Sequence, residues 1–436
     1  MKNLKEEAEQ IFLATLNALD LKPLVKSKLR LEDETLYLNS GSVSLKDFKE
    51  IVLIGIGKAS LTIGGALEGL LGDRITRGIL VSDRRHELRL KSEVIIAGHP
   101  LPDRNSLLAG KKIIELLQTT TPDSLIIFII TGGGSAAVEQ AISEDVSLED
   151  LRDLNRLIVN CGATIREMNI VRKHLSRIKG GRLGHLARKS SSIALYLSDV
   201  NPGDLRSIAS NPLLPDEVKL KDFFDILEKY RLEEKLPSSI RNLIGKGEIP
   251  ELPRAWGNEK MNVNILLADN QDAITAAARA ARARGFEVET DSRFTEGDYK
   301  IVSRELIKRL LSMKRRFPDR VVCLVSGGEV SCPVSGDGLG GRNQEFVLYT
   351  ALELSGIGEP QIAVLSCGTD GIDGNSDAAG AVADSDLIKA AGARGISASD
   401  FLARNDSHSF FKAMGGLVYT GPTGNNVRDV RLFLAE

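Results

Sequence analysis

The chain has 436 residues, more than the roughly 100–200 of a typical domain, so we expect two or three domains. Lys and Arg number 57 against 59 Asp and Glu, a formal net charge of −2, so no overall basic field recruits nucleic acid. The apolar runs are too short to span a bilayer, and the first residues lack the apolar core of a signal peptide. We therefore expect a cytoplasmic protein with no membrane partner.

Short aliphatic runs alternate with amphipathic segments through the first half of the chain. The runs predict strands and the segments predict helices, as in βαβ units whose parallel sheet is covered on both faces. This half is therefore predicted to be a doubly wound α/β domain. The predicted strands are Ile51–Ile56, Gly78–Ser82, Glu93–Ala97, Leu125–Ile130 and Ile193–Ser198, and the predicted helices are Leu61–Leu71, Ser106–Gln118, Leu148–Asn160 and Met168–Ser176.

Two polar stretches, Asn201–Asp216 and Lys246–Asn262, interrupt the alternation and are predicted to be loops or linkers. A second alternating block follows them. We therefore expect two α/β domains, residues 1–255 with the N-terminal helix and residues 256–436, with the functional site in a cleft between them. The second block has predicted strands at Val263–Ala268, Phe286–Thr290, Val321–Val325, Ile362–Ser366 and Leu417–Tyr419, and predicted helices at Asp272–Arg284 and Val302–Arg316.

The first glycine-rich turn, Gly55–Ser60, lies between a predicted strand and a predicted helix and contains Gly55, Gly57 and Lys58. Glycine lets the backbone turn sharply, and a helix N-terminus with a cation beside it suits an anion. The spacing matches neither a P-loop nor a dinucleotide-binding fingerprint. An anion site and an ordinary tight turn are equally good interpretations.

The second glycine-rich turn follows the strand Leu125–Ile130 and contains Gly132, Gly133, Gly134 and Ser135. Successive glycines expose backbone N–H groups of the kind that bind phosphate. Three glycines in a merely structural turn carry an entropic cost, so we favour the functional interpretation.

A third glycine-rich segment follows the predicted strand Val321–Val325. Farther along, Arg342 lies at the start of the next helical segment, where its planar guanidinium suits a carboxylate or a phosphate. A surface arginine beside a flexible loop is the alternative. The segment begins with Ser326, Gly327, Gly328 and Glu329.

Aspartates cluster in two further loops. Asp370 and Asp373 lie among glycines, but the loop lacks the terminal Glu of an EF-hand, so holding Mg²⁺ or capping a helix fits better. Asp199 and Asp204 follow the predicted strand Ile193–Ser198, where α/β enzymes place functional groups. They suit a general base or a Mg²⁺ ligand, and turn formation is the alternative.

Histidines and cysteines give no catalytic pattern. The four cysteines form no CxxC pair, and His99 in the turn after Glu93–Ala97 is expected to be structural. Arg172 and its basic neighbours near a helix C-terminus are expected mainly to complement the helix dipole. Glycine turns, isolated cations and carboxylates suit phosphoryl transfer, in which a protein mainly positions groups and neutralises charge.

As a set, these motifs resemble the class II glycerate kinases, whose C-terminal half is the MOFRL domain. The matching stretches follow one another over nearly the whole chain, and together they are highly specific. They are GIGKAS (55–60), GHPLPDRNS (98–106), TGGGSA (131–136), MNIVRKHLSRIKGGRL (168–183), SDVNPGDLRSIAS (198–210), SGGE (326–329), GGRNQE (340–345), GTDGIDGNSDAAGA (368–381), NDSHSFF (405–411) and TGPTGNNVRD (420–429).

The resemblance implies a Rossmann-like N-terminal domain, a smaller α/β domain, and phosphorylation of D-glycerate to 2-phosphoglycerate with ATP and Mg²⁺. By position it implies that Lys58, Asp199 and Arg342 are the catalytic and charge-stabilising residues. Our hypothesis is that Arg342 holds the glycerate carboxylate, Asp199 accepts the hydroxyl proton, and Lys58 with the glycine turns and Mg²⁺ holds the triphosphate. Asp204, Asp370 and Asp373 are the predicted metal ligands, and a monomer or homodimer is expected.

The chain departs from the family pattern at Asn211-Pro212-Leu213, where Gly-Pro-Thr is usual, and at His408, where Tyr is usual. Two other functions remain open. An NAD(P)H-dependent hydroxypyruvate reductase needs a GxGxxG turn directly after a strand, which the sequence lacks. A non-catalytic protein that binds a phosphorylated metabolite would be stabilised by its ligand without releasing ADP.

Overall fold

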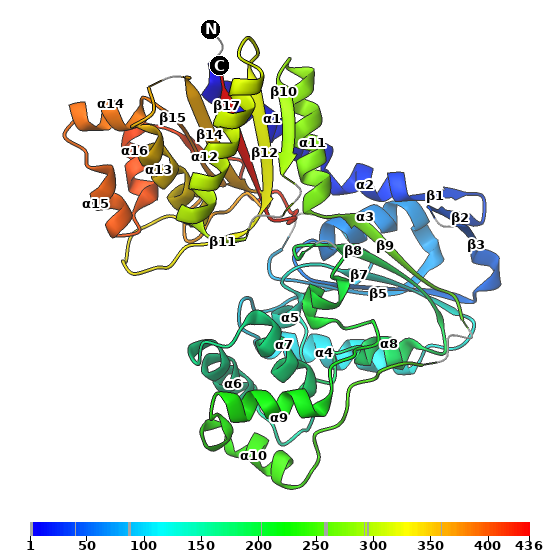
Figure 1. Ribbon diagram of the computed structural model, residues 1–436. Helices are drawn as coiled ribbons and strands as arrows, with labels where there is room; N and C mark the ends of the chain where they lie inside the picture. The colour runs from blue at the N-terminus through cyan, green and yellow to red at the C-terminus, as the bar shows by residue number, and fades with distance from the viewer. Residues whose placement is uncertain are drawn as a thin grey trace. The chain divides into compact units, whose positions relative to one another are not determined.

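The computed structural model describes residues 3–39, 41–85, 89–201, 203–256, 260–291, 293, 296–358 and 360–436. The chain forms two compact units. Unit 1 contains Met1–Asp20 and Ala268–Glu436, and unit 2 contains Leu21–Leu267. Each unit has a six-stranded sheet between helices, so the predicted class of two α/β domains is confirmed (Figure 1).

The sheet of unit 2 has the strand order β6-β5-β4-β7-β8-β9. The pairs from β6 to β8 are parallel, and helices connect β4 to β5, β6 to β7 and β7 to β8, returning the chain to the same end of the sheet. Strand β5 lies on one side of β4, and β7 lies on the other side. The strand order therefore reverses direction between β4 and β7, which makes this position a topological switch point. The strands are β4 (Glu50–Ile56), β5 (Ile75–Ser82), β6 (Glu93–Ile96), β7 (Ser124–Ile130), β8 (Ser191–Leu197) and β9 (Asn262–Ala268).

Helices cover both faces of this sheet because its strands are apolar on both sides. Helix α3 (Ser60–Leu71) packs on β4, β5 and β7. The opposite face forms one hydrophobic cluster with α4 (Arg104–Gln118) and α8 (Arg182–Ala187). The helix predicted to begin at Ser106 begins two residues earlier, because the side chain of Asp103 caps its N-terminus.

The rest of unit 2 lies outside the sheet. Helices α6 (Leu148–Asn160), α7 (Ile165–His174), α9 (Leu220–Lys229) and α10 (Ser238–Gly245) contribute to a separate hydrophobic cluster. Helix α7 begins earlier than predicted because Thr164 and Glu167 form a capping box. A short helix α2 (Leu21–Lys28) leads into an antiparallel sheet of β1 (Leu29–Glu32), β2 (Thr35–Leu38) and β3 (Gly41–Ser44).

The sheet of unit 1 is mixed, with the order β10-β12-β17-β14-β15-β16. Its central strand β17 runs antiparallel to both of its neighbours. The sequence reading missed β15 and β17, and β17 carries Asp429 and Arg431, which hide its apolar character. The strands are β10 (Glu287–Asp291), β12 (Val322–Gly328), β14 (Ile362–Gly368), β15 (Gly380–Asp384), β16 (Leu417–Val418) and β17 (Asp429–Ala435).

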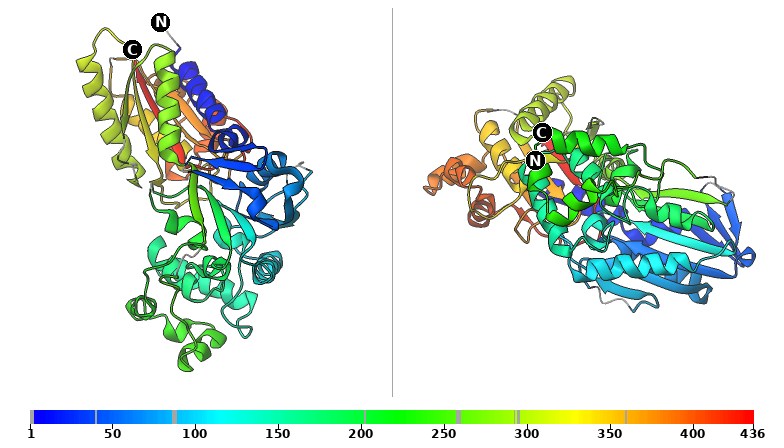
Figure 2. Two further views of the ribbon diagram at one scale, coloured as in Figure 1. Left: turned by 90° about the vertical axis from the view of Figure 1, so that its right-hand side faces the viewer. Right: turned by 90° about the horizontal axis from the view of Figure 1, so that it is seen from below.

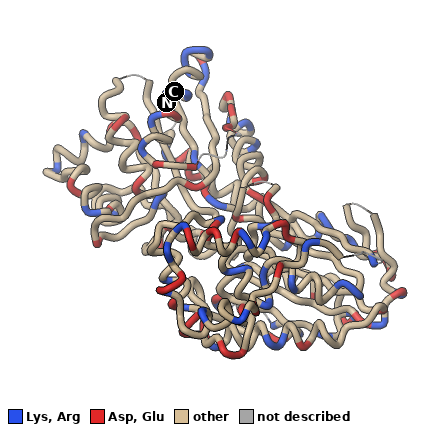
Figure 3. Tube along the Cα trace, turned by 60° about the horizontal axis from the view of Figure 1, so that its bottom comes forward, with Lys and Arg blue, Asp and Glu red and all other residues tan. Residues whose placement is uncertain are grey.

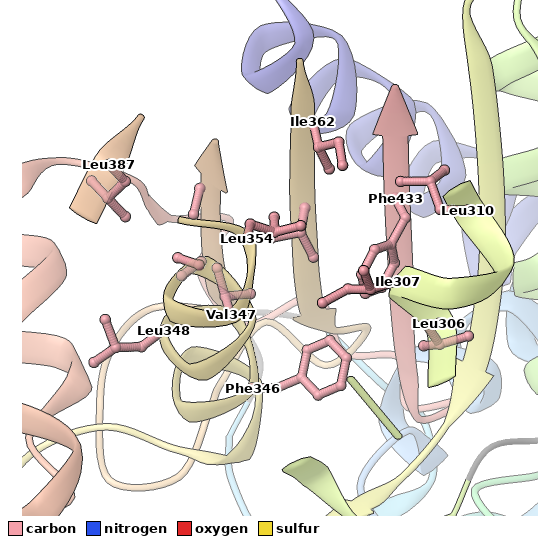
Figure 4. Close-up of a cluster of buried hydrophobic side chains, with 14 of the residues drawn as sticks. Leu306, Ile307, Leu310, Phe346, Val347, Leu348, Leu354, Ile362, Leu387 and Phe433 are labelled. Atoms are coloured by element: carbon pink, nitrogen blue, oxygen red, sulfur yellow. The ribbon is translucent and has the colours of Figure 1, made fainter. Parts of the chain in front are cut away.

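The core of unit 1 is built by helices on the two faces of this sheet. Helices α12 (Tyr299–Arg316) and α13 (Arg342–Leu354) pack Ile307 and Phe346 toward Phe433 on β17 (Figure 4). Helices α1 (Leu4–Ala18) and α11 (Asn270–Ala283) contact the sheet and each other. Figure 2 shows α1, in dark blue, beside the C-terminal strand. Small helices α14 (Leu387–Ala393), α15 (Ala398–Ala403) and α16 (Ser407–Met414) complete the unit.

This division differs from the expected boundary between residues 255 and 256. Helix α1 belongs with the C-terminal part of the chain, because it buries Ala8, Ile11 and Phe12 there. Strand β9 is the last strand of the unit 2 sheet, and nearby the Ser192 N–H donates to the Met261 carbonyl over 2.8 Å. Sequence periodicity locates an element but does not say which sheet it joins.

Charges of both signs are interspersed along the chain, in keeping with the small net charge (Figure 3). A search of the described residues finds no helix with the length and apolarity needed to cross a bilayer.

Candidate active site

The candidate site of unit 2 lies where its parallel strands end. Lys58 follows β4, Asp83 follows β5, His99 follows β6, Gly132 follows β7 and Asp199 follows β8. The carboxyl ends of parallel strands share one edge of a sheet, so the loops that follow them meet there.

The two glycine-rich turns at the switch point are bonded to each other. The Lys58 N–H donates to the Gly132 carbonyl over 2.9 Å, and the Ala59 N–H donates to the Thr131 hydroxyl over 3.2 Å. Gly57 has a φ of +111°, and a Cβ on it would lie 2.4 Å from the Thr131 hydroxyl oxygen. Only glycine fits there, so the pair of turns is a fixed backbone platform.

Lys58 extends along this platform. A Cβ added to Gly133 would lie 3.0 Å from Lys58 Cγ and 3.4 Å from Lys58 Cε, so the lysine stem passes over the glycine. Within the described ranges the Lys58 ammonium makes no hydrogen bond or ion pair. A half-buried cation with no protein partner is available to an anionic ligand.

Asp199 packs against the same platform. A Cβ on Gly132 would lie 2.0 Å from Asp199 Oδ2, so the carboxylate occupies the space that a side chain would fill. The structure thus brings together Lys58, Gly132, Gly133 and Asp199, which the sequence predicted separately.

Two groups that the sequence reading did not assign to the site also lie here. The His99 ring is near Gly133, with its Cδ2 3.4 Å from an added Cβ. Desolvation, aided by the charge of Lys58, lowers the pKa of His99, so its imidazole is neutral at pH 7. Burial raises the pKa of Asp83, but hydrogen bonds and charge from Arg84, with the charge of Lys58, lower it overall. Their place after β5 and β6 was the signal that could have identified them.

The remaining predicted residues of the second turn serve packing and a hydrogen bond. A Cβ on Gly134 would lie 2.7 Å from the Ala209 Cβ. The hydroxyls of Ser135 and Ser210 are 2.7 Å apart.

Gly55, in the first turn, also serves packing. A Cβ on Gly55 would lie 2.5 Å from a Leu80 methyl carbon, so a larger residue does not fit there.

Arg342 lies in unit 1 and is held by two carboxylates. Its Nε and Nη2 donate to the two oxygens of Asp429 over 2.7 and 2.9 Å. Its Nη1 lies 2.6 Å from Glu329 Oε1. Asp429 is fully buried, and the charge and hydrogen bonds of Arg342 outweigh burial to lower its pKa. This geometry leaves one N–H on each terminal nitrogen of Arg342 for a ligand.

Asp373 caps helix α13. Its two oxygens accept the N–H groups of Asn343 and Gln344, over 3.0 and 2.9 Å, and also the side-chain amides of both residues. Burial nevertheless raises the pKa of Asp373 to about 6. Asp370 accepts the N–H of Ile372 in its turn. This fits the helix-capping alternative considered for this loop.

The segment predicted as a third glycine turn lies within a strand. Ser326, Gly327 and Gly328 are the last residues of β12, and Glu329 follows them. A Cβ on Gly327 would lie 2.0 Å from the Asn270 side-chain oxygen, which also accepts the Gly328 N–H over 2.7 Å. Because these glycines lack side chains, Asn270, the first residue of α11, can pack directly against β12.

The predicted metal ligands are divided between the two units, and their role stays a prediction. Asp204 belongs to unit 2, where it accepts the Ser207 hydroxyl, whereas Asp370 and Asp373 belong to unit 1. In the part of the chain that the structure describes, no group of three or more His, Cys, Asp or Glu side chains is arranged to hold a metal ion. A Mg²⁺ ion carried by nucleotide phosphates does not require such a cage.

Comparison with known proteins decides the family. The model described as "Domain of unknown function (DUF4147)" matches residues 7–245, and the MOFRL family model matches residues 322–429. The D-glycerate 2-kinase of Thermotoga maritima is 34% identical over 384 residues, covering 87% of this chain and 89% of that protein. The chain belongs to the MOFRL family of glycerate kinases.

Two further comparisons concern this family. A crystal structure of the glycerate kinase from Thermotoga maritima has a TM-score of 0.86 and 31% sequence identity, and the match covers 100% of both chains. A putative hydroxypyruvate reductase of Agrobacterium vitis is 38% identical over 389 residues, covering 88% of this chain and 86% of that protein. The predicted resemblance is therefore confirmed, and as a member of the glycerate kinase family the protein is a kinase.

Proposed function

We propose that the protein transfers the γ-phosphoryl group of ATP to D-glycerate and forms 2-phosphoglycerate, with Mg²⁺ bound to the nucleotide phosphates. The relatives named glycerate kinases support the substrate. One observation carries the type of reaction: the Lys58 ammonium has no partner among the described residues and extends over Gly133, while Asp199 lies against Gly132. A cation, a glycine platform and a carboxylate are the groups that phosphoryl transfer requires.

Lys58 and the glycine turns stabilise charge in this proposal. The transition state of phosphoryl transfer spreads negative charge over the equatorial oxygens of the transferred group. A lysine whose stem is fixed against a glycine needs little reorganisation to meet that charge. Mg²⁺ supplies further charge neutralisation when it is bound with the nucleotide.

Asp199 is proposed as the base that accepts the proton of the attacking hydroxyl. A carboxylate is a suitable acceptor when it lies within hydrogen-bond reach of that hydroxyl. Asp199 is half-buried and packs against Gly132, so its position is set by backbone rather than by a mobile side chain.

The catalytic role of Arg342 stays a prediction. Its guanidinium is fixed by Asp429 and Glu329, which offset much of its charge. It retains N–H groups for a ligand, but fewer than an unpaired arginine offers.

A single coupled assay tests the reaction. We expect ADP release that requires both D-glycerate and Mg²⁺ and stops when EDTA is added, with 2-phosphoglycerate as the product identified by phosphorus NMR. The name of the Agrobacterium relative favours a reductase as the second candidate. Oxidation of NADPH or NADH by hydroxypyruvate without glycerate-dependent ADP release would overturn the kinase proposal in favour of the reductase.

A further inference from the structure

Arg172 on α7 is a half-buried cation, and the carboxylate whose charge acts on it, Glu139, already has other partners. Glu139 accepts the Ser176 hydroxyl and the Gln140 N–H on one oxygen and pairs with the buried Lys179 on the other. Arg172 is left with no ion pair in the described part of the chain. Burial lowers the pKa of Arg172 and the charge of Glu139 opposes that effect, which places the two groups near each other. Glu139 is therefore the ion-pair partner of Lys179 and not of Arg172.

A chain of hydrogen bonds joins Arg172 to the second glycine turn. The Ser135 and Ser210 hydroxyls are bonded over 2.7 Å, and Ser210 donates to Asn169 Oδ1 over 3.3 Å. The same oxygen accepts Arg172 Nη1 over 3.4 Å. Arg172 Nε donates to Asn155 Oδ1 over 2.8 Å, which fixes the plane of the guanidinium. Arg172 therefore has a defined orientation near the Thr131–Ser135 turn.

Asn169 and Arg172 each keep N–H donors that have no acceptor among the described residues. Asn169 accepts two hydrogen bonds on its oxygen, while its side-chain NH₂ group has no acceptor among the described residues. Arg172 Nη2 likewise has none. The hydrogen bond between Arg172 Nη1 and Asn169 Oδ1 keeps the guanidinium and the amide group in contact, and both carry N–H donors of the kind that a carboxylate accepts.

The backbone opposite this pair is strained. Ala209, Ser210 and Asn211 have φ values of +50°, +58° and +56°, a left-handed conformation that side chains other than glycine rarely adopt. Asn211 is held there by hydrogen bonds from its NH₂ group to Asp216 and the Leu214 carbonyl. Such strain is concentrated at ligand-binding sites, where surrounding contacts maintain it.

We infer that Arg172 and Asn169 bind the carboxylate of the acceptor substrate, a small hydroxy acid. This inference rests on the proposed function, and it moves the carboxylate contact first predicted for Arg342 to unit 2. Arg342 already binds the Asp429 carboxylate with two nitrogens, whereas Arg172 has no carboxylate partner in the described ranges. The same two donors also suit a phosphate of the nucleotide, so the test must separate the two anions.

Arg172→Lys is the first variant, because lysine keeps the charge but lacks the planar fork. We expect the Kd for D-glycerate, measured by titration calorimetry without nucleotide, to rise at least about tenfold, and the KM for D-glycerate to rise with it. The KM for ATP should stay within about twofold. A rise in the KM for ATP with unchanged glycerate binding assigns the donors to the nucleotide and overturns the inference, as does no change in either.

Asn169→Asp keeps the oxygen that accepts Ser210 and Arg172 but replaces the donor with a second acceptor. Asn169→Asp should weaken glycerate binding about tenfold while retaining the fold. This variant therefore tests the inference even if Arg172→Lys does not fold. Arg166→Gln is the matched control, since Arg166 is exposed on the same helix, and it should leave both constants unchanged.

The wild-type protein separates this inference from the proposed function. Glycerate-dependent ADP release with undiminished glycerate binding in both variants overturns the inference alone. Glycerate binding that depends on Arg172 without ADP release supports the inference and overturns the kinase reaction. Absence of both ADP release and glycerate binding in the wild type overturns both.

Discussion

The two units treat their charged groups in opposite ways. In unit 2, Lys58 and Arg172 lie near the glycine turns without an ion pair in the described ranges. In unit 1, Arg342 is bound to Asp429 and Glu329, and Asp373 is fully engaged in capping α13. Lys58 and Arg172 of unit 2 therefore remain available to a ligand, whereas Arg342 and Asp373 of unit 1 stabilise the unit that contains them.

The direction of one central strand explains the contrast. In unit 2, β4 and β7 are parallel, so only loops that leave the sheet lie at that edge. In unit 1, β17 runs antiparallel between β12 and β14, and its first residue, Asp429, pairs with Gly328 and Gly368 at the ends of those strands. The antiparallel strand therefore delivers a carboxylate to the edge where Arg342 lies. The topology decides whether a cation there remains available.

Lys58→Ala gives the largest expected effect. Turnover should fall by about 10²- to 10³-fold, because the variant removes one positioned charge from the transition state. The melting temperature should stay unchanged, since Lys58 has no partner among the described residues to lose. Steady-state ADP release and thermal unfolding measure the two quantities. Lys26→Ala, on the exposed face of α2, is the control for loss of a lysine, and a destabilised but active Lys58→Ala protein would contradict the contrast.

Gly132→Ala tests the contact between the glycine platform and Asp199. The new Cβ would lie 2.0 Å from Asp199 Oδ2, so the carboxylate must move. A displacement of about 1 Å at a catalytic group costs about 10²-fold in rate, so we expect a loss of that size in kcat. Gly69→Ala in α3 is the control, because its Cβ would meet nothing within 4 Å. Full activity in Gly132→Ala would remove Asp199 from the mechanism.

Arg342→Lys tests the stabilising role of charge in unit 1. Lysine cannot donate to both oxygens of Asp429, so this fully buried carboxylate is left partly unsatisfied. We expect the free energy of unfolding of unit 1 to fall by about 2 kcal/mol in urea titrations. Arg320→Lys, whose surface pair with Glu287 is exposed, should change it by less than about 0.5 kcal/mol. Unchanged unfolding with impaired ligand binding would instead make Arg342 equivalent to Lys58.

Glu345→Gln tests how a buried carboxylate of unit 1 affects stability at different pH values. Burial, with the charge of Asp373, raises the pKa of Glu345 to about 7, although Ser407 opposes the shift. The native state therefore binds a proton more tightly than the unfolded state, so this group costs stability as the pH rises from about 4.5 to 7. The variant should gain about 1–2 kcal/mol at pH 8 and nothing near pH 4.5. Urea denaturation of the wild type and the variant at pH 8 and at pH 4.5 measures this difference. An equal difference in stability at the two pH values would contradict the prediction.

Much of the fold is predictable from local patterns. Continuous aliphatic runs identify β4 to β8, and helical periodicity identifies α6 over the predicted residues. The site of unit 2 follows in part from the same information, since turns after parallel strands meet at one edge. That rule predicts Asp199, whereas Lys58 and Gly132 are predicted from glycine-rich turns that follow strands, and the structure places the three together.

The sequence by itself determined the elements, the glycine turns and the family, because propensity, periodicity and motif spacing are properties of short segments. Only the tertiary structure showed that β17 is central and antiparallel and that Ser326–Gly328 belong to a strand. It also showed that Arg342 is paired, whereas Arg172 has no ion pair among the residues that the structure describes. The pairing of a charge depends on groups distant in sequence, such as Asp429 for Arg342, which meet only when the strand order is fixed.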